Sequence, residues 1–198
     1  MKNFYKAVED RRSIYGISKE EVVSDEKILE IINHAVTYAP TAFNSQSGRI
    51  LVLFREHHDR LWDITKETLR RIVPAKKFAS TEEKIKSFRS GYGTILFFEN
   101  QIVVRGLQEK FPSYQETFPI WSQQSSGMLQ YIIWTALEAE GLGASLQHYN
   151  PLIDDEVKKE WDISQDWKLI AQMPFGKPTA PAAAKEFMPL EGRIKVFK

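Results

Sequence analysis

Two short polar motifs near the N-terminus hold the side chains best suited to chemistry. The first, Arg11-Arg12-Ser13, follows an amphipathic segment whose pattern predicts a first helix. Two guanidinium groups and a hydroxyl at the end of a helix can bind a phosphate, because charge-assisted hydrogen bonds are strong and the arginine fork matches the anion. Surface ion pairs with the preceding Glu9 and Asp10 are the alternative.

The second motif reads Pro40-Thr41-Ala42-Phe43-Asn44-Ser45-Gln46. The Asn44 and Gln46 amides each offer two donors and an acceptor, which suits the edge of a heterocycle that alternates carbonyl and N–H groups. Amides at a turn also commonly satisfy loop backbone, and an aromatic residue such as Phe43 is by default part of a core. If both motifs bind a ligand, a phosphate at one end and a ring at the other describe a mononucleotide.

A glycine-containing run, residues 141–145, follows the pattern of a long apolar helix. Gly141 and Gly143 can end that helix, one of them in the left-handed conformation. Glycine also lets a backbone approach a planar ring closely, which would place residues 144–147 near such a ring. Two further segments, residues 175–178 and 192–193, lie toward the C-terminus.

With these four elements in this order, the chain resembles the FMN-dependent nitroreductases, and in particular a short subgroup whose second motif reads Phe-Asn-Ser-Gln. Many members of the family have Pro-Trp after the glutamine, where this chain has Ser47-Gly48-Arg49, and a longer insertion between the central helices. The resemblance implies that a late basic residue completes the phosphate site, Arg193 or alternatively Lys195, and that Phe43 walls the flavin pocket from the neighbouring subunit. The cofactor-binding residues that it implies are Arg11, Arg12, Ser13, Pro40, Phe43, Asn44, Gln46, Ala144, Ser145, Leu146, Gln147 and Arg193.

The resemblance also implies an activity. FMN would accept hydride at N5 from NADH or NADPH, and a nitroaromatic or quinone-type acceptor, a small aromatic molecule, would take the electrons in a ping-pong cycle. No catalytic side chain is needed beyond the flavin, because the cofactor carries the chemistry. The alternative is a flavin- or ligand-binding regulatory module with little turnover.

Composition excludes several other classes of protein. The 198 residues include 27 basic and 26 acidic side chains, a formal net charge of +1, so nucleic acid is not an expected partner. This length favours a single domain, residues 1–198. The chain has no cysteine, which excludes disulfides, thiol catalysis and cysteine-ligated metals and fits a reducing compartment. We therefore expect a cytoplasmic protein.

Neither a membrane nor a metal ion is expected. The most apolar helical stretch, residues 128–139, is shorter than the about 20 residues that cross a membrane, and it contains Gln130 and Glu138. The N-terminus has no signal-peptide pattern. His57 and His58 are adjacent, so on a helix they would point about 100° apart and could not share a metal.

Hydrophobic spacing predicts three main helices and four strands. The helices span residues 25–39, 57–73 and 118–140, and Ser24 and Pro40 are start and stop signals for the first. Apolar runs predict buried strands over residues 50–54, 94–98 and 167–173, and a fourth strand over residues 193–197. This order favours an α+β fold, a mixed sheet flanked by helices around one core.

The predicted terminal strand follows a Pro/Ala-rich segment, residues 178–189, whose composition favours extended chain. The strand could close onto the edge of its own sheet, or it could add to the sheet of a partner. The resemblance implies the second arrangement, a homodimer with exchanged C-terminal strands. The helical stretch 128–137, apolar on nearly all sides, agrees with it, because two subunits together could bury such a helix.

Overall fold

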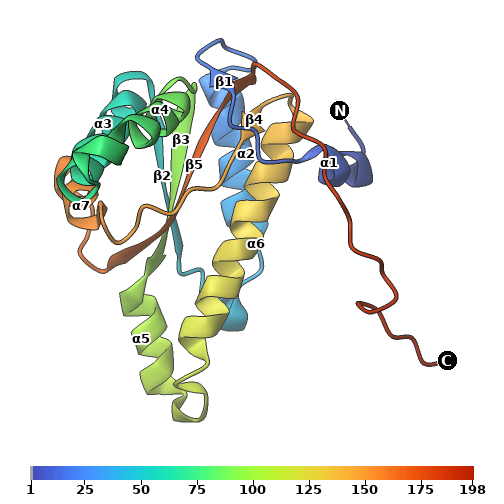
Figure 1. Ribbon diagram of the computed structural model, residues 1–198. Helices are drawn as coiled ribbons and strands as arrows, with labels where there is room; N and C mark the ends of the chain where they lie inside the picture. The colour runs from blue at the N-terminus through green and yellow to red at the C-terminus, as the bar shows by residue number, and fades with distance from the viewer. Residues whose placement is uncertain (1) are drawn as a thin grey trace.

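A five-stranded sheet lies between two layers of helices in the computed structural model, which describes residues 2–198 (Figure 1). The strand order is β1-β5-β3-β2, and β4 pairs with β5. The strand pairings are antiparallel, and within the described residues the sheet is mixed only through an isolated parallel bridge between Ser13 and Ala144. The strands are β1 (Ile17–Ser18), β2 (Gly48–Phe54), β3 (Gly93–Asn100), β4 (Gly143–Ala144) and β5 (Trp167–Pro178).

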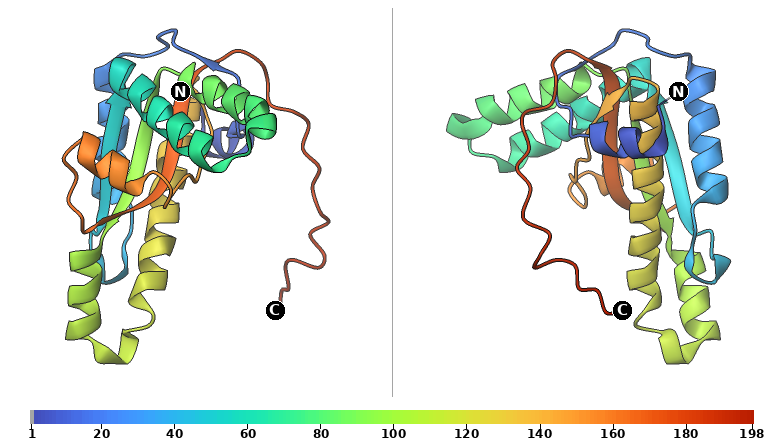
Figure 2. Two further views of the ribbon diagram at one scale, coloured as in Figure 1. Left: turned by 60° about the vertical axis from the view of Figure 1, so that its left-hand side comes forward. Right: turned by 90° about the vertical axis from the view of Figure 1, so that its right-hand side faces the viewer.

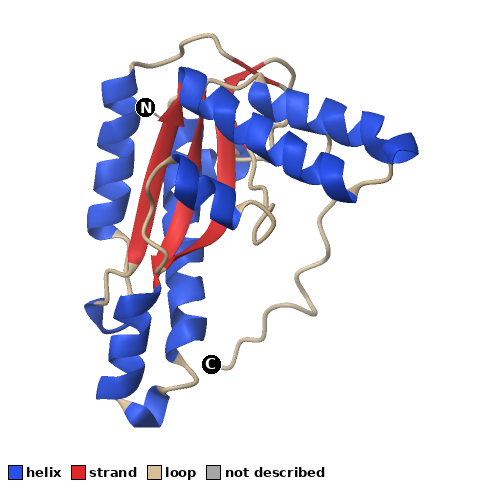
Figure 3. Cartoon of the chain, turned by 90° about the vertical axis from the view of Figure 1, so that its left-hand side faces the viewer, coloured by secondary structure: helices blue, strands red, loops and turns tan. Residues whose placement is uncertain are grey.

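The helices divide between the two faces of the sheet (Figure 3). Helices α2 and α6 cover one face, α3, α4 and α7 cover the other, and α5 packs beside α6 below the sheet. None of the helices in residues 2–198 is both long and apolar enough to cross a membrane. The helices are α1 (Phe4–Asp10), α2 (Asp25–Tyr38), α3 (Arg55–Ile72), α4 (Phe78–Arg89), α5 (Gln101–Lys110), α6 (Phe118–Ala139) and α7 (Asp154–Glu160), with short 3-10 turns η1 (Ala42–Asn44), η2 (Ala75–Lys77) and η3 (Pro112–Tyr114).

Alternation along β3 creates the two cores. Ile95 and Phe97 pack with α2 and α6, whereas Leu96 and Phe98 pack with α3, α4 and α7. Side chains of a strand point alternately to opposite faces, so a run without polar residues is stable only where both faces are covered. The continuous apolar run therefore correctly predicted a buried strand.

The main predicted elements are confirmed with small shifts at their ends. The helix predicted over residues 25–39 is α2, whose N-cap Ser24 accepts a hydrogen bond from the Lys27 N–H. The helices predicted over 57–73 and 118–140 are α3 and α6, and the three buried strands are β2, β3 and β5. Helices α4, α5 and α7 and the two-residue strands β1 and β4 were not predicted.

The predicted terminal strand at residues 193–197 is wrong for the single chain. Arg193 ends a turn, and residues 194–198 have no strand partner in the part of the chain that the structure describes. Residues 180–198 run away from the sheet as an extended arm (Figure 2). The physical reason is that the tail leaves the sheet at the end of β5, where β1 pairs, and does not return to the opposite edge of the sheet, at β2 on the other side of β3 (Figure 2). The arm leaves large apolar side chains exposed: Phe187, Met188, Leu190, Ile194, Val196 and Phe197.

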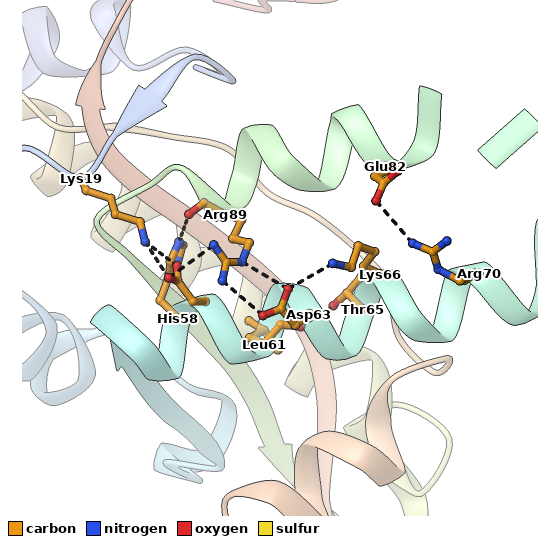
Figure 4. A network of polar contacts seen from close by, with 10 residues as sticks. Lys19, His58, Leu61, Asp63, Thr65, Lys66, Arg70, Glu82 and Arg89 are labelled. Carbon is orange, nitrogen blue, oxygen red and sulfur yellow. Dashed lines mark hydrogen bonds and ion pairs between the residues drawn. The ribbon is translucent and has the colours of Figure 1, made fainter. Parts of the chain in front are cut away.

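A fully buried histidine joins α3 to α4 and β3 (Figure 4). His58 Nε2 lies 3.1 Å from the Arg89 carbonyl oxygen, so this nitrogen must donate. Its Nδ1 then accepts from the Thr94 hydroxyl at 2.8 Å, and that hydroxyl oxygen accepts from the Trp62 indole N–H at 3.0 Å. The neutral imidazole satisfies every group in this chain of hydrogen bonds, and burial lowers the pKa of His58 to about 4.

This histidine should make folding sensitive to acid. Its pKa in the unfolded chain is near 6.5 and in the folded chain about 4, so below pH 6.5 the unfolded state binds the extra proton and the free energy of unfolding falls until about pH 4. The full loss is about 3 kcal/mol. Urea unfolding between pH 7 and 4 measures it. His58→Gln should flatten this part of the profile, and the exposed His57→Gln should not; equal slopes for both variants would contradict the assignment.

Candidate functional site

The first motif lies where α1 ends, against the start of β4. Arg11 is the C-cap residue of α1, and Ser13 forms the parallel bridge with Ala144. The Ile14 N–H donates to the Ala144 carbonyl oxygen at 2.9 Å. Residues 11–13 and 144–147, which the sequence analysis placed at one ligand, are therefore neighbours in the fold.

The two arginines line a surface cavity of about 530 Å³. Its opposite wall is the beginning of the C-terminal arm, residues 180–183 and Lys185. The Arg12 guanidinium donates to the Ala183 carbonyl oxygen at 2.9 Å. The Arg11 guanidinium stacks over the Trp134 ring of α6 at 4.4 Å, and its Nε is buried without a hydrogen-bond partner in the described chain. The predicted ion pairs of these arginines with Glu9 or Asp10 are not formed; Lys2 and Lys6 pair with Asp10 instead.

Residues 144–147 begin beside this cavity, where Ala144 bridges to Ser13. Ser145 and Gln147 are buried, and the Gln147 amide donates to the Ser145 hydroxyl at 3.0 Å. Gln147 also exchanges backbone hydrogen bonds with Gln172 of β5, at 2.7 and 2.9 Å. These side chains are thus committed to local contacts, so what they can offer a ligand is a rigid stretch of backbone.

The two glycines before this stretch have separate roles. Gly141 has φ +86°, which confirms the predicted left-handed residue after α6. At Gly143 a Cβ atom would lie 2.7 Å from the Ile14 side chain, so only glycine allows the first motif to pack this closely on β4.

The second motif is a strained loop at the other end of the sheet. Phe43, Asn44 and Gln46 have φ of 55°, 50° and 48°, a region that residues with side chains rarely adopt and that clusters at functional sites. Phe43 is 52% exposed, so the interpretation as an ordinary core residue is wrong. Its ring packs among the aromatic side chains where α5 and α6 meet: Phe111, Tyr114, Phe118 and Trp121.

The backbone of this loop is fixed while its amides face outward. The Gln46 N–H donates to the Thr41 hydroxyl at 3.1 Å, and the Gln46 carbonyl accepts from Arg49 at 2.8 Å. Asn44 and Gln46 are exposed, and the described residues give neither side-chain amide a partner. Amides held by a rigid loop, with their own hydrogen bonds unused, are suited to a ligand. Pro40 follows the end of α2 and is exposed.

Within one chain the two motifs are far apart. Ala144 pairs with Phe175, which pairs with Gly93, which pairs with Phe54 at the end of β2. The second motif precedes Gly48 at the opposite end of this seven-residue strand. At about 3.3 Å per residue the separation along the sheet is roughly 20 Å. The two cavities beside the motifs share no lining residue.

Arg193 is exposed on the arm and does not line the cavity of Arg11 and Arg12. Its N–H donates to the Leu190 carbonyl oxygen at 2.8 Å, which closes a turn within the arm. Lys195, the alternative, is also exposed on the arm. Among the tail residues that line the cavity, Lys185 is the basic one, and the sequence analysis did not predict it.

Sequence reasoning also missed a buried carboxyl beside the second motif. Glu99 near the end of β3 is 1% exposed and lines a cavity of about 160 Å³ together with Gln46 and Arg49. The Ser47 hydroxyl donates to Glu99 Oε2 at 2.6 Å. Burial raises the pKa of Glu99 to about 6. The signal in the sequence was an acidic residue directly after the apolar run at residues 95–98.

Comparison with known proteins places the chain in a class of oxidoreductases. Residues 8–177 match the model of the nitroreductase family. The nitroreductase FRM2 of Saccharomyces cerevisiae is 32% identical over 189 residues, which cover 94% of this chain and 93% of the relative. The chain therefore belongs to the nitroreductase family.

Solved structures agree with this assignment. The nitroreductase CinD from Lactococcus lactis in complex with chloramphenicol is 46% identical, with a TM-score of 0.91 over 99% of this chain and 100% of the other. The same enzyme was solved with 4-nitrophenol, at a TM-score of 0.90. A protein from Desulfovibrio desulfuricans in complex with FMN is 21% identical and shares the fold, with a TM-score of 0.71 over 100% of both chains.

Proposed function

We propose that this protein is an FMN-dependent oxidoreductase that moves electrons from NADH or NADPH to nitroaromatic or quinone-type acceptors. The observation that carries the proposal is the cavity at Arg11 and Arg12, which adjoins the rigid backbone of residues 144–147. Family membership and the FMN complex of a protein with this fold support the choice of cofactor.

The residues present fit the phosphate end of FMN. Arg11 has a buried Nε without a partner, and Arg12 contacts only a backbone carbonyl of the arm. Both guanidiniums therefore retain donors for an anion, and an arginine fork matches a phosphate. Ser13 adds an exposed hydroxyl beside them.

The chain's own residues would bind and orient the cofactor. When bound, FMN supplies the redox chemistry, accepting hydride at N5 and passing electrons to the acceptor in a ping-pong cycle. The Asn44 and Gln46 amides would hydrogen-bond the polar edge of the ring. Donors there would stabilise negative charge on a reduced ring, because preorganised donors act where charge develops. No side chain has to serve as a catalytic acid, since an open site admits water.

A homodimer would bring the two motifs to one ligand. Roughly 20 Å separates them in one chain, so a site that uses both needs the second motif of a partner. The chain has a surface suited to this: an apolar groove of about 350 Å³ between α1 and α6, lined by Phe4, Tyr131 and Ile132 among others. The exposed apolar side chains of the arm offer further surface that a second copy could bury.

The acceptor class is proposed from relatives. Chloramphenicol and 4-nitrophenol, which were bound to a nitroreductase 46% identical to this chain, are small nitroaromatic molecules. The aromatic side chains around Phe43 offer rings on which such an acceptor could stack. We place the protein in the cytoplasm, where nicotinamide cofactors are available and a chain without cysteine is at no disadvantage.

The purified protein should be yellow and should bleach under anaerobic conditions when NADH or NADPH is added. Absorbance spectra before and after each nicotinamide, and again after 4-nitrophenol, measure both half-reactions. Bleaching followed by recovery of the colour identifies an electron-transferring enzyme. A yellow protein that neither nicotinamide reduces would identify the regulatory module with little turnover, and a protein that takes up no FMN would overturn the proposal.

A further inference from the structure

Glu99 is a buried carboxyl to which the proposed activity gives no role. It belongs to β3 and lies under α6, where Ser125 and Leu129 line the same cavity. Among the described residues it has no ion pair. Burial raises its pKa, and the Ser47 hydrogen bond and then the charge of Arg49 lower it by less. The Arg49 guanidinium is engaged instead with the Gln46 and Gly48 carbonyl oxygens, both at 2.8 Å.

An unpaired buried acid does not stabilise the fold. Removing a carboxylate from water without a countercharge is costly, and an apolar residue of similar size commonly gives a more stable protein. Next to Glu99, the loop with Phe43, Asn44 and Gln46 in the left-handed region is also unfavourable. Strained backbone of this kind persists only when the surrounding structure holds it.

The contacts of Glu99 supply that support. Its carboxylate accepts the Ser47 hydroxyl at 2.6 Å, and the next residue, Asn100, donates its N–H to the Ser47 carbonyl at 2.9 Å. Ser47 is 1% exposed and directly follows Gln46. The end of β3 therefore holds Ser47 through both its side chain and its backbone, and the direction of Gln46 follows from that.

We propose that Glu99 is a positioning residue that, through Ser47, holds the Asn44 and Gln46 amides in the orientation that binds the flavin ring. This inference rests on the proposed FMN site. It adds a residue from β3 that needs no contact with the nicotinamide or the acceptor.

The position of Glu99 gives the loop a dependence on pH. The Glu99 carboxyl lines the same cavity as Gln46 and Arg49 of β2. Lys168 of β5 is the residue opposite Glu99 across the sheet, so Arg49 and Lys168 are its charged neighbours. The residues that α6 contributes to this cavity, Ser125 and Leu129, are uncharged. Deprotonation near pH 6 places a negative charge beside the amides. This charge should make a flavin bound there harder to reduce. A plot of the flavin reduction potential against pH should therefore show an additional step near pH 6.

Three variants of the full chain test the proposal: Glu99→Gln, Ser47→Ala and, as a matched control, Glu109→Gln at an exposed acid on α5. FMN affinity and the reduction potential are measured from pH 5 to 8. Glu99→Gln should bind FMN nearly as well as the parent and lose the step near pH 6. Ser47→Ala should bind FMN roughly 10-fold more weakly and keep the step, moved to higher pH because the Ser47 hydrogen bond lowers the pKa of Glu99. The control should match the parent in both.

Hydrogen exchange at the amides of residues 44–47 gives a readout that does not need the cofactor. Ser47→Ala should exchange these amides at least several-fold faster than Glu109→Gln, with unchanged exchange in β5. If the parent binds no FMN but the loop amides respond in this way, the proposed function fails and the positioning role stands. Unchanged exchange, or a step near pH 6 that survives in Glu99→Gln, overturns the inference.

Discussion

Replacing Arg11 and Arg12 together by alanine should yield a folded protein that purifies without flavin. Each guanidinium lost from a half-buried phosphate site should cost about 1.5 to 3 kcal/mol, roughly 10- to 150-fold in affinity. The fold should tolerate the change, because Arg12 contacts only a carbonyl of the arm, and Arg11 stacks on the half-buried Trp134 ring of α6 and belongs to neither core. Flavin absorbance of the purified protein and titration of the apoprotein with FMN measure the effect.

A matched double variant controls for the loss of two positive charges. Arg60 and Arg105 form exposed ion pairs with Glu160 and Asp166, so Arg60→Ala/Arg105→Ala removes the same charge far from the cavity. This control should retain its flavin. If the Arg11/Arg12 variant binds FMN as tightly as the control does, the phosphate does not lie in this cavity. The two single variants then show which arginine contributes more.

Local sequence patterns predicted the elements that carry dense apolar faces. Helix α2 was found because its buried residues recur at helical spacing between a clear cap and a proline. Helix α4 was missed because it buries only Phe78, Ile85 and Phe88 and is otherwise highly charged. Helix α5 buries Val104 alone. Elements of this kind exist because tertiary packing selects them, and a single-sequence pattern contains little of that information.

The terminal strand was predicted from its pattern but is absent from residues 2–198 of the single chain, whereas α4 and α5 are present but were not predicted. Ile194 and Val196 alternate with charged residues, as in a strand with one buried face. A strand also needs a neighbour with unpaired hydrogen-bonding groups, and the sequence does not say whether the chain's own sheet provides one. In the described part of the single chain, the tail leaves the sheet beyond β5 and reaches no strand edge, so pairing within the chain is wrong and pairing with a partner stays a prediction.

The sequence predicted which residues could form the site, but it did not predict how far apart they lie in the fold. The first motif does lie beside Ala144, through Ser13 and Ile14, because Gly143 allows Ile14 to pack against β4. The distance to Gln46 depends on the register of β2, β3 and β5, which no local pattern contains. Glu99 was overlooked because an acid at the end of an apolar run usually marks the exposed end of a strand, whereas here α6 covers it.

Truncation after Pro189 should abolish the proposed dimer and its bound flavin together. It removes Arg193 and most of the exposed apolar side chains of the arm while leaving the sheet and both cores intact. An obligate interface should bury at least about 2,000 Å², and the arm has large exposed apolar side chains that such an interface would cover. Light scattering after gel filtration and flavin content of the same fractions measure the two losses.

A point substitution tests the same interface without shortening the chain. Phe4 is 68% exposed on α1 and lines the apolar groove, whereas Ile72 is 56% exposed at the end of α3 on the other side of the sheet. Phe4→Glu should weaken the dimer and the binding of FMN in parallel, because a charge would be buried in the interface, and Ile72→Glu should change neither. A truncated or Phe4→Glu protein that is monomeric yet holds FMN as tightly as the parent would show that one chain binds the cofactor alone. The second motif would then have to serve a ligand of its own, since the length of β2 keeps it from reaching the first.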